Sequence, residues 1–248
     1  MKFIRYAKGK TEYRGILDED IIKRVNGTLF HDYSVTNERE YLKDVKVLPP
    51  VLPSKILGIR KNYGEKTQDM KEPQIFMKPP ASITASGENI IIPPQVSSVR
   101  AEGELAVIIG KKCAFAEEKR VSDYIFGFTI ANDVTLPFDT PDKTVTIGKF
   151  FDTFTPIGPV INTDTDYSDL TIKTYKNGEE VQNGMTKDMI FGIPEIISYL
   201  SSITTLLPGD VILTGTPLPA VEIQNGDVIE ISIDGIGRLI NNVTRKER

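Results

Sequence analysis

The stretch AEGELAVIIG, residues 101–110, is the part of the chain that decides the fold. Leu105 to Ile109 is a continuous apolar run, which is typical of a strand covered on both faces. Glu102 and Glu104 are two positions apart, so in an extended segment both side chains leave the same face while Gly103 points the other way. The sequence therefore predicts a buried strand with two carboxylates at its mouth.

A third acid follows a second apolar segment. Asp133 lies in Asn-Asp-Val at 132–134, directly after the predicted strand 126–131. Carboxylates that project from buried strands repel one another unless a positive charge lies between them, and Mg²⁺ is a hard cation that prefers oxygen ligands. Glu102, Glu104 and Asp133 are therefore a candidate metal site. The alternative is a solvated strand end and a turn capped by Asp133, because short motifs of this kind also occur by chance.

Length and charge bound the class of protein. The chain has 248 residues, of which 40% are hydrophobic, enough for one large core with a small appendage. A net charge of −4 and the absence of a dense Lys/Arg block argue against a nucleic-acid partner. No stretch of the sequence reaches membrane-spanning length. We therefore expect a cytoplasmic protein that has neither nucleic acid nor membrane as a partner.

Several cofactors and mechanisms are disfavoured by what the sequence lacks. Cys113 is the single cysteine and His31 the single histidine, so a disulfide, a zinc cluster and an iron–sulfur cluster are not expected. A nucleophilic triad would have to use His31, which has no nucleophile elbow near it. No glycine-rich phosphate or dinucleotide loop is present, so NAD, FAD and ATP are not indicated.

The remaining pattern predicts a mainly β protein of the α+β class. Short segments rich in Ile, Val and Phe are bounded by Gly or Pro, and Asn177-Gly178 favours a tight hairpin turn. The prolines at 49, 50 and 53 predict a boundary between a small N-terminal β subdomain (1–52) and a larger catalytic domain (53–248). The predicted strands are 2–6, 12–25, 55–59, 74–78, 88–92, 104–109, 126–131, 157–161, 170–175, 180–182, 211–214, 228–233 and 237–243, and the predicted helices are 115–124 and 193–203.

Many motifs in one order resemble the catalytic domain of the fumarylacetoacetate hydrolase family across about residues 55–245. They are KILGI at 55–59 with Asn62-Tyr63, FMKPP at 76–80, AEGELAVIIGK at 101–111, GFTIANDV at 127–134, GKFFDTFTPIGP at 148–159, NGEEVQ at 177–182, LPGDVILTGTP at 207–217 and NGDVIE at 225–230. The resemblance implies a mixed β-roll with few helices, a homodimer, and Mg²⁺ or Mn²⁺ held by Glu102, Glu104 and Asp133.

The resemblance also implies an enzyme that acts on a small 2-oxo acid. Such an acid can chelate the metal through a carboxylate oxygen and the keto oxygen, and the metal then acts as a Lewis acid toward the developing enolate. C–C hydrolysis, decarboxylation, isomerisation and dehydration can all pass through a metal-bound enolate, so hydrolase, isomerase and lyase stay open. Two alternatives are a 2-oxo-3-deoxy sugar-acid dehydratase of the same superfamily and a catalytically inactive, metal-dependent 2-oxo acid binder.

Further site residues follow from the resemblance. Lys149 falls on the family's lysine beside the metal, where its charge could stabilise or reprotonate an enolate; the alternative is a purely structural partner for the acids. Tyr63, Gln182 and Thr216 fall at the family's substrate pocket. Lys78 is a candidate for the same pocket, with a surface turn as the alternative interpretation.

One departure from the family concerns the lid. Hydrolytic and decarboxylating members carry a histidine three residues after the Tyr of Asn-Tyr and a glutamate three residues beyond it, and this chain has Lys66 and Asp69 there. A lysine serves as a base near neutral pH only if burial or nearby positive charge lowers its pKa. The departure weakens the hypothesis of acylpyruvate hydrolysis relative to proton transfer around an enolate, and Lys66 with Asp69 remain candidates for a lid base.

Overall fold

The computed structural model describes residues 1–68, 70–96, 98–137 and 145–247. Asp69, one of the two candidate lid residues, lies outside the described residues. The described strands are β1 (Lys2–Lys8), β2 (Thr11–Asp18), β3 (Ile21–Gly27), β4 (Tyr33–Tyr41), β5 (Lys46–Leu48), β6 (Ile56–Arg60), β7 (Gln74–Lys78), β8 (Ile83–Thr84), β9 (Ile90–Ile92), β10 (Val99–Ala101), β11 (Gly103–Ile109), β12 (Ile125–Asn132), β13 (Thr155–Asn162), β14 (Thr171–Lys176), β15 (Glu179–Met185), β16 (Val211–Leu213), β17 (Val221–Ile223), β18 (Val228–Ile233) and β19 (Gly237–Arg245).

Helices are few, as predicted. The described residues contain two α-helices, α1 (Val145–Lys149) and α2 (Ile193–Ile203), and four short 3-10 helices at Leu42–Asp44, Pro80–Ser82, Glu118–Tyr124 and Thr186–Asp188. α2 has proline in its first turn and buries one apolar face, which confirms the predicted helix. The predicted helix 115–124 is a 3-10 helix that begins only at Glu118. No helix of the described part of the chain is long and apolar enough to cross a membrane.

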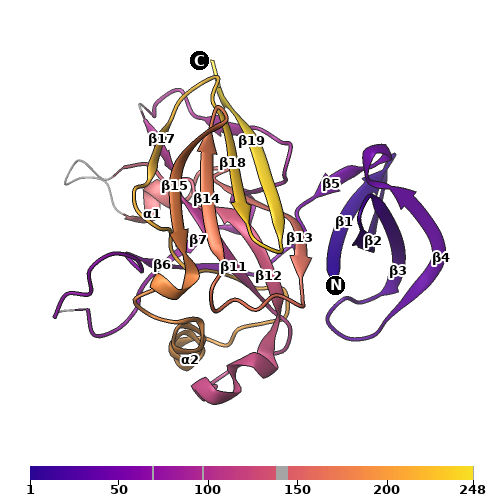
Figure 1. The fold of residues 1–248 in the computed structure, drawn as a ribbon, viewed down its shortest axis with the longest axis horizontal. Coiled ribbons are helices and arrows are strands. Elements are labelled where there is room, and N and C mark those ends of the chain that lie inside the picture. Colours follow the sequence, from indigo (N-terminus) through magenta and orange to yellow (C-terminus); the bar gives the residue numbers. More distant parts are fainter. Residues whose placement is uncertain (69, 97, 138–144, 248) are drawn as a thin grey trace.

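The largest sheet joins strands from both ends of the sequence. Its order is β4-β3-β2-β1-β13-β12-β11-β16-β6-β7, with β5 paired to β1 and β8 paired to β13 (Figure 1). β16 runs parallel to β6 whereas β11 is antiparallel to both of its neighbours, so the sheet is mixed. Every residue of β11 is buried. The prediction of a core strand at AEGELAVIIG is confirmed.

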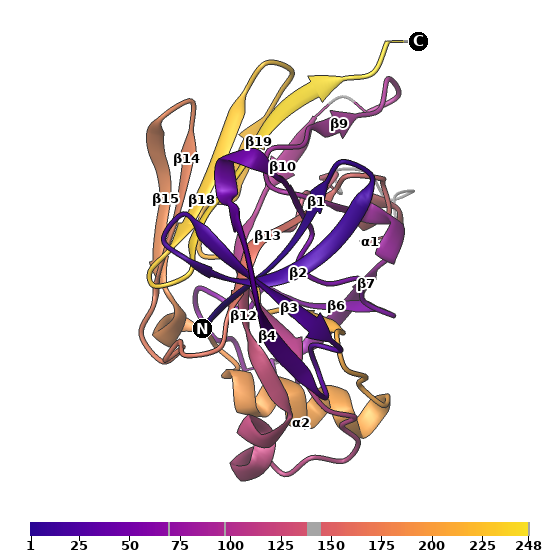
Figure 2. The same cartoon turned by 90° about the vertical axis from the view of Figure 1, so that its right-hand side faces the viewer.

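A second sheet packs behind the two glutamates. Its order is β15-β14-β18-β19-β9 (Figure 2). The strands β10 and β17 form a separate two-stranded sheet. A Cβ atom added at Gly103 would lie 2.6 Å from Thr174 Oγ1 and 3.1 Å from Ile231 Cγ2. Glycine is therefore needed between Glu102 and Glu104, because β14 and β18 approach that side of the strand closely.

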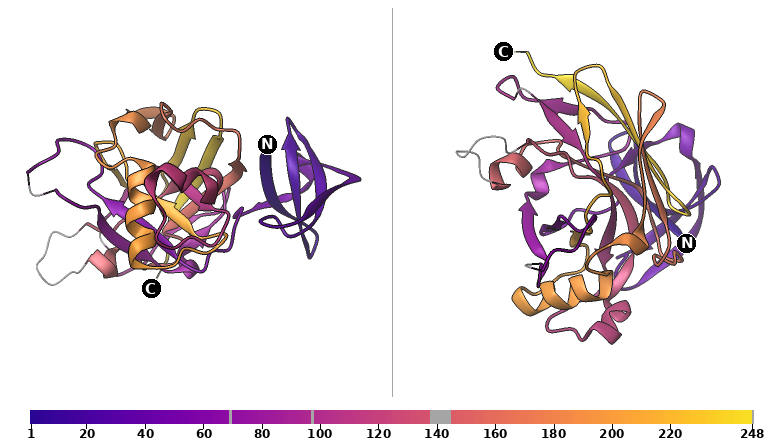
Figure 3. Two further views of the ribbon diagram at one scale, coloured as in Figure 1. Left: turned by 90° about the horizontal axis from the view of Figure 1, so that it is seen from below. Right: turned by 60° about the vertical axis from the view of Figure 1, so that its left-hand side comes forward.

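The N-terminal strands β1–β5 lie to one side of the rest of the molecule (Figure 3). They join it through β1, where Phe3 pairs with Ile161 of β13. The division into 1–52 and 53–248 stays a prediction. Two details of this region were predicted wrongly: 12–25 is two strands joined by a turn in which Glu19 has φ 53°, and β4 occupies a stretch that has no strand signal in the sequence. β4 is mostly exposed on both faces, so it needs no apolar alternation.

Candidate functional site

The pairing of β11 with β12 brings the three predicted acids together. Gly103 pairs with Asn132, the Asp133 N–H donates to the Glu102 carbonyl at 2.9 Å, and the Glu102 N–H donates to Asn132 Oδ1 at 3.0 Å. Glu102, Glu104 and Asp133 each place a carboxylate oxygen within 4.8 Å of the other two. Glu104 and Asp133 are fully buried, and Glu102 is partly buried. This is the geometry of a candidate metal site.

Two lysines from distant segments hold Asp133. Lys78 Nζ donates to Asp133 Oδ1 at 2.5 Å and to the Val134 carbonyl at 3.0 Å. Lys149 Nζ donates to Asp133 Oδ2, to Glu102 Oε2 at 3.0 Å and to Thr135 Oγ1 at 2.5 Å. Lys78 is fully buried, so its interpretation as a surface-turn residue is wrong.

Short structural elements position both ammonium groups. Lys149 ends α1, a five-residue helix that packs against β7, and Lys78 ends β7. The ring of Phe76, also on β7, lies 4.4 Å from Lys149 Nζ, a cation–π distance. The helix gives no sequence signal because one turn is too short for an apolar period.

The acids differ in their protonation. Burial, together with the charges of Asp133 and Glu102, raises the pKa of Glu104 well above its usual value. Burial also raises the pKa of Glu102, although Lys149 opposes it. Burial would raise the pKa of Asp133 as well, but Lys149 and Lys78 outweigh it and lower that pKa. Glu104 is thus the acid whose charge is least compensated.

The pKa values of the two lysines shift in opposite directions. Burial acts to lower the pKa of Lys149, but the charges of Asp133 and Glu102 outweigh it and the pKa is raised, so Lys149 keeps its proton. For Lys78 burial wins over the attraction of Asp133, and the pKa is lowered. When every group is ionised, three carboxylates face two ammonium groups. The cluster then carries one negative charge in excess, and its oxygen donors fit a hard divalent cation.

The acid cluster opens into a cavity of about 500 Å³. Lys149, Tyr63 and Thr216 line it, together with three basic side chains that the sequence pattern did not single out, namely Arg60, Lys61 and Arg100. Arg100 could have been found from its parity, since it lies two residues before Glu102 on the same run of extended chain. Among the described lining residues Glu65 is the one further acid, so outside the acid cluster the basic residues outnumber the acidic ones.

Tyr63 lines this cavity, and its hydroxyl is buried. The hydroxyl oxygen has no hydrogen-bond partner, and burial, followed by the negative charges of Glu104 and Asp188, raises the pKa of Tyr63. Asn62 fixes the segment, because its side-chain amide donates to the carbonyls of Thr214 at 2.8 Å and Phe191 at 3.0 Å. An unpartnered hydroxyl on a residue that lines a cavity is a candidate contact for a ligand.

Gln182 and Thr216 build one wall. Gln182 Nε2 donates to Thr216 Oγ1 at 3.0 Å and to the Pro219 carbonyl at 2.9 Å, and Gln182 Oε1 accepts from Thr174 Oγ1 at 2.6 Å. The Thr216 hydroxyl donates to the Gly103 carbonyl at 2.8 Å. Thr216 lines the cavity, whereas Gln182 lies behind it and holds the 216–219 segment in place. Next to this wall, the Gly215 N–H donates to Glu104 Oε2 at 2.7 Å.

The lid candidate Lys66 is not among the residues that line the cavity. It is exposed, and its Nζ lies 4.8 Å from the centre of the Phe191 ring. Its role as a lid base stays a prediction, as does that of Asp69.

This fold and this site define the catalytic domain of the fumarylacetoacetate hydrolase family, and comparison with known families agrees. The chain belongs to that family: the family model described as "Fumarylacetoacetate (FAA) hydrolase C-terminal" matches residues 55–244. A second model, "Rv2993c-like, N-terminal", matches residues 1–50. Members of the family are enzymes, among them isomerases, hydrolases and tautomerases.

Three relatives carry informative names. The structure of 5-carboxymethyl-2-hydroxymuconate delta-isomerase from Mycobacterium smegmatis superposes with a TM-score of 0.95 at 35% identity, covering 99% of this chain and 100% of that one. A maleylpyruvate hydrolase from Sphingobium, in complex with manganese(II) ion and pyruvate, gives 0.85 at 26% identity with full coverage of both chains. Oxaloacetate tautomerase FAHD2A of Bos taurus is 36% identical, covering 81% of this chain and 70% of that protein.

Proposed function

We propose that the chain is a divalent-metal-dependent enzyme that acts on a small 2-oxo acid, and that it catalyses proton transfer between the keto and enol forms or an isomerisation through the enol. The observation that carries the proposal is the shared cavity of the acid cluster and Lys149. The names of the related isomerase and tautomerase, and the manganese and pyruvate in the related hydrolase, support it.

Glu102, Glu104 and Asp133 would hold Mg²⁺ or Mn²⁺. Once bound, such a cation supplies Lewis-acid polarisation of a carbonyl oxygen. The charge of the cluster supports an anionic ligand, because a divalent cation would turn its excess of one negative charge into an excess of one positive charge. A 2-oxo carboxylate provides the matching negative charge.

Lys149 is the proposed proton donor. Its raised pKa keeps the ammonium protonated, and its contacts with Glu102, Asp133 and Thr135 hold Nζ at the edge of the acid cluster. Tyr63 would donate its unpartnered hydroxyl hydrogen to a substrate oxygen, which fixes the substrate's orientation.

The choice of reaction rests on which bases reach the cavity. Among the described residues that line it there is no imidazole, and Lys66 lies outside the lining. Water activation for C–C hydrolysis lacks its usual base. In the enol-to-keto direction Lys149 would donate a proton to the enol carbon, the enol hydroxyl proton would pass to solvent water, and solvent would return a proton to Lys149. Decarboxylation and C–C hydrolysis remain secondary candidates, and the homodimer and the cytoplasmic location remain predictions.

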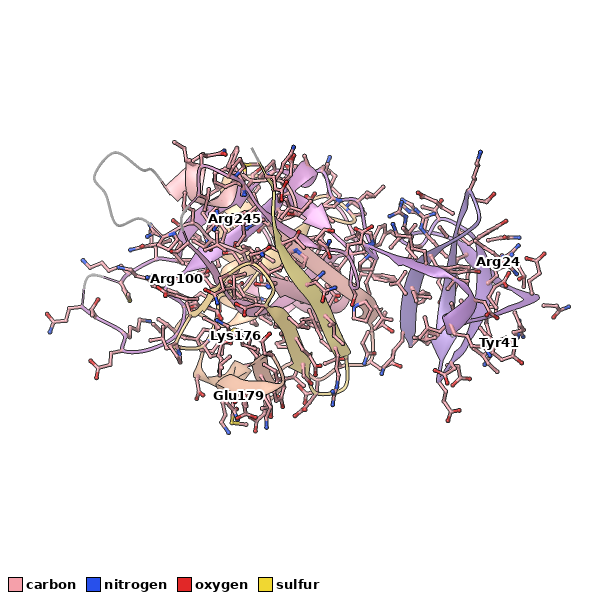
Figure 4. The ribbon with its side chains drawn as sticks, turned by 90° about the horizontal axis from the view of Figure 1, so that it is seen from above. Arg24, Tyr41, Arg100, Lys176, Glu179 and Arg245 are labelled. Carbon is pink, nitrogen blue, oxygen red and sulfur yellow. The ribbon has the colours of Figure 1, made fainter. Side chains whose placement is uncertain are left out.

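The test is a substrate panel with Mg²⁺ or Mn²⁺: enol and keto oxaloacetate, diene-dioates, acylpyruvates and 2-oxo-3-deoxy sugar acids. We expect saturable tautomerisation or isomerisation that falls at least about 100-fold in Glu104→Gln, since buried metal ligands are rarely replaceable. Glu179→Gln is the matched control and keeps full activity, because Glu179, labelled in Figure 4, is exposed at the start of β15.

Other outcomes of this substrate panel would support the alternative functions. Turnover of sugar acids alone would support the dehydratase, and metal-dependent binding of pyruvate without any turnover would support the inactive binder. Full activity of Glu104→Gln would reject the site itself.

A further inference from the structure

Arg100 is the basic side chain whose position relative to the acid cluster is best defined. It lies on β10, two residues before Glu102, and lines the same cavity. Its backbone is tied on both sides: the Arg100 N–H donates to the Thr135 carbonyl at 2.8 Å, and the Thr135 N–H donates to the Arg100 carbonyl at 2.9 Å. Thr135 in turn contacts Glu102 and Lys149 through its hydroxyl. Arg100 is therefore held in fixed register with the candidate metal site.

Within the protein, the guanidinium of Arg100 has only a weakly bound ion-pair partner. Its ion-pair partner is Glu222, directly opposite on β17, and Nη2 lies 3.9 Å from Oε1, which is longer than a hydrogen bond. The side chains are 39% and 72% exposed, so water screens the pair and it contributes little. A guanidinium stays charged at every physiological pH and presents paired N–H donors that match a carboxylate. These donors are available to a ligand in the cavity.

The charges that line the cavity indicate the charge of the ligand. One substrate carboxylate already matches the positive charge that a divalent cation would add to the acid cluster. Outside the acid cluster and Lys149, the described lining has three basic residues, Arg60, Lys61 and Arg100, and one acid, Glu65, so the rest of the lining is positive. A cavity of about 500 Å³ also has room for more than a three-carbon acid.

We propose that Arg100 binds a second carboxylate of the substrate and thereby selects 2-oxo acids with two carboxylates over those with one. Glu222 is the competing internal anion that the substrate's carboxylate replaces. Arg100 is a specificity-determining residue that acts through binding and takes no part in the proton transfer. The proposal rests on the proposed function, since it presupposes that a 2-oxo acid occupies the cavity.

The experiment compares two acids that differ only in the second carboxylate, oxaloacetate and 2-oxobutanoate. Their dissociation constants are measured by calorimetry with the full chain saturated with Mn²⁺, for wild type, Arg100→Met and Glu222→Gln. We expect wild type to prefer oxaloacetate. Arg100→Met should weaken oxaloacetate binding by about 10- to 100-fold and change 2-oxobutanoate binding by less than about twofold, as for loss of one charged recognition pair.

Glu222→Gln is expected to change the affinity for oxaloacetate in the opposite direction. Removing the internal anion should tighten oxaloacetate binding by about two- to fivefold and leave 2-oxobutanoate unaffected, because an exposed pair contributes little. Arg60→Met is the matched control on the same cavity, and melting curves check that each variant folds.

The outcomes separate the two proposals. Equal weakening of both acids by Arg100→Met, no weakening of either, or a selective loss in Arg60→Met instead would overturn the assignment of Arg100 while the proposed function stands. Failure of wild type to bind either acid with Mn²⁺ would overturn both.

Discussion

Replacing the buried Glu104 by Gln is expected to stabilise the metal-free protein. The pKa of Glu104 is raised by burial and then by Asp133 and Glu102, so the folded state binds this proton more tightly than the unfolded state does. Above the pKa of the unfolded chain, the unfolded state gains free energy by ionising Glu104 while the folded state keeps the proton. Stability therefore falls as the pH rises, until the folded pKa is passed. Each unit of raised pKa corresponds to about 1.4 kcal/mol, or roughly 3–6 °C in melting temperature for a chain of this size.

Gln keeps the shape of Glu104 and can still accept the Gly215 N–H bond, so the gain is not cancelled by a lost contact. With bound metal, the wild type is expected to melt at a higher temperature than Glu104→Gln. A cation at 100 times its Kd stabilises the wild type by about 2.7 kcal/mol, or roughly 5–11 °C, and the variant lacks one of its three candidate ligands. Melting curves at pH 6, 7 and 8, with EDTA or with Mn²⁺, measure both effects.

Asp210→Asn is the control for this experiment. Asp210 is also fully buried, but it accepts hydrogen bonds from Ser54 Oγ at 2.6 Å, Lys55 Nζ at 2.5 Å and the Leu207 N–H at 2.7 Å. Its replacement should lower the melting temperature in every condition and leave the Mn²⁺ response intact, because it removes one partner of the buried ion pair with Lys55. A lower melting temperature for Glu104→Gln in EDTA at pH 8, or an undiminished Mn²⁺ response, would refute the reasoning.

Three further predictions concern the same site. The apparent Kd for Mn²⁺, measured by calorimetry, should fall from pH 6 to pH 8, since the raised pKa values of Glu102 and Glu104 mean that the metal displaces protons; a flat profile would contradict it. Lys149→Met should reduce kcat at least about 100-fold in a tautomerase assay, as expected for loss of a general acid, and retained kcat would exclude that role. Lys66→Ala should keep kcat/KM within about twofold, because the side chain is exposed and outside the cavity lining. A tenfold loss would instead support the hypothesis that Lys66 is a lid base.

Local pattern predicted much of the fold. The apolar run after Glu104 identified β11, and Asn177-Gly178 identified the β14–β15 hairpin, where φ values of 54° and 86° match a tight turn. The pattern missed β4 and α1 for different reasons. β4 is an exposed edge strand whose hydrogen bonds come from β3, so it has little apolar face to display. α1 is a single turn whose position depends on its packing against β7.

In the candidate site, too, local pattern predicted some residues, and the others depend on tertiary packing. Alternation along one strand found Glu102 and Glu104, and it would have found Arg100, because residues two apart share a face. It could not find what neutralises them: the two ammonium groups on Asp133 come from residues 55 and 16 positions away, on β7 and α1. The excess of one negative charge that the fully ionised cluster carries is therefore a property of the tertiary structure. It is also the quantity that argues for a divalent cation, because a third lysine in the same place would have balanced the acids without a metal.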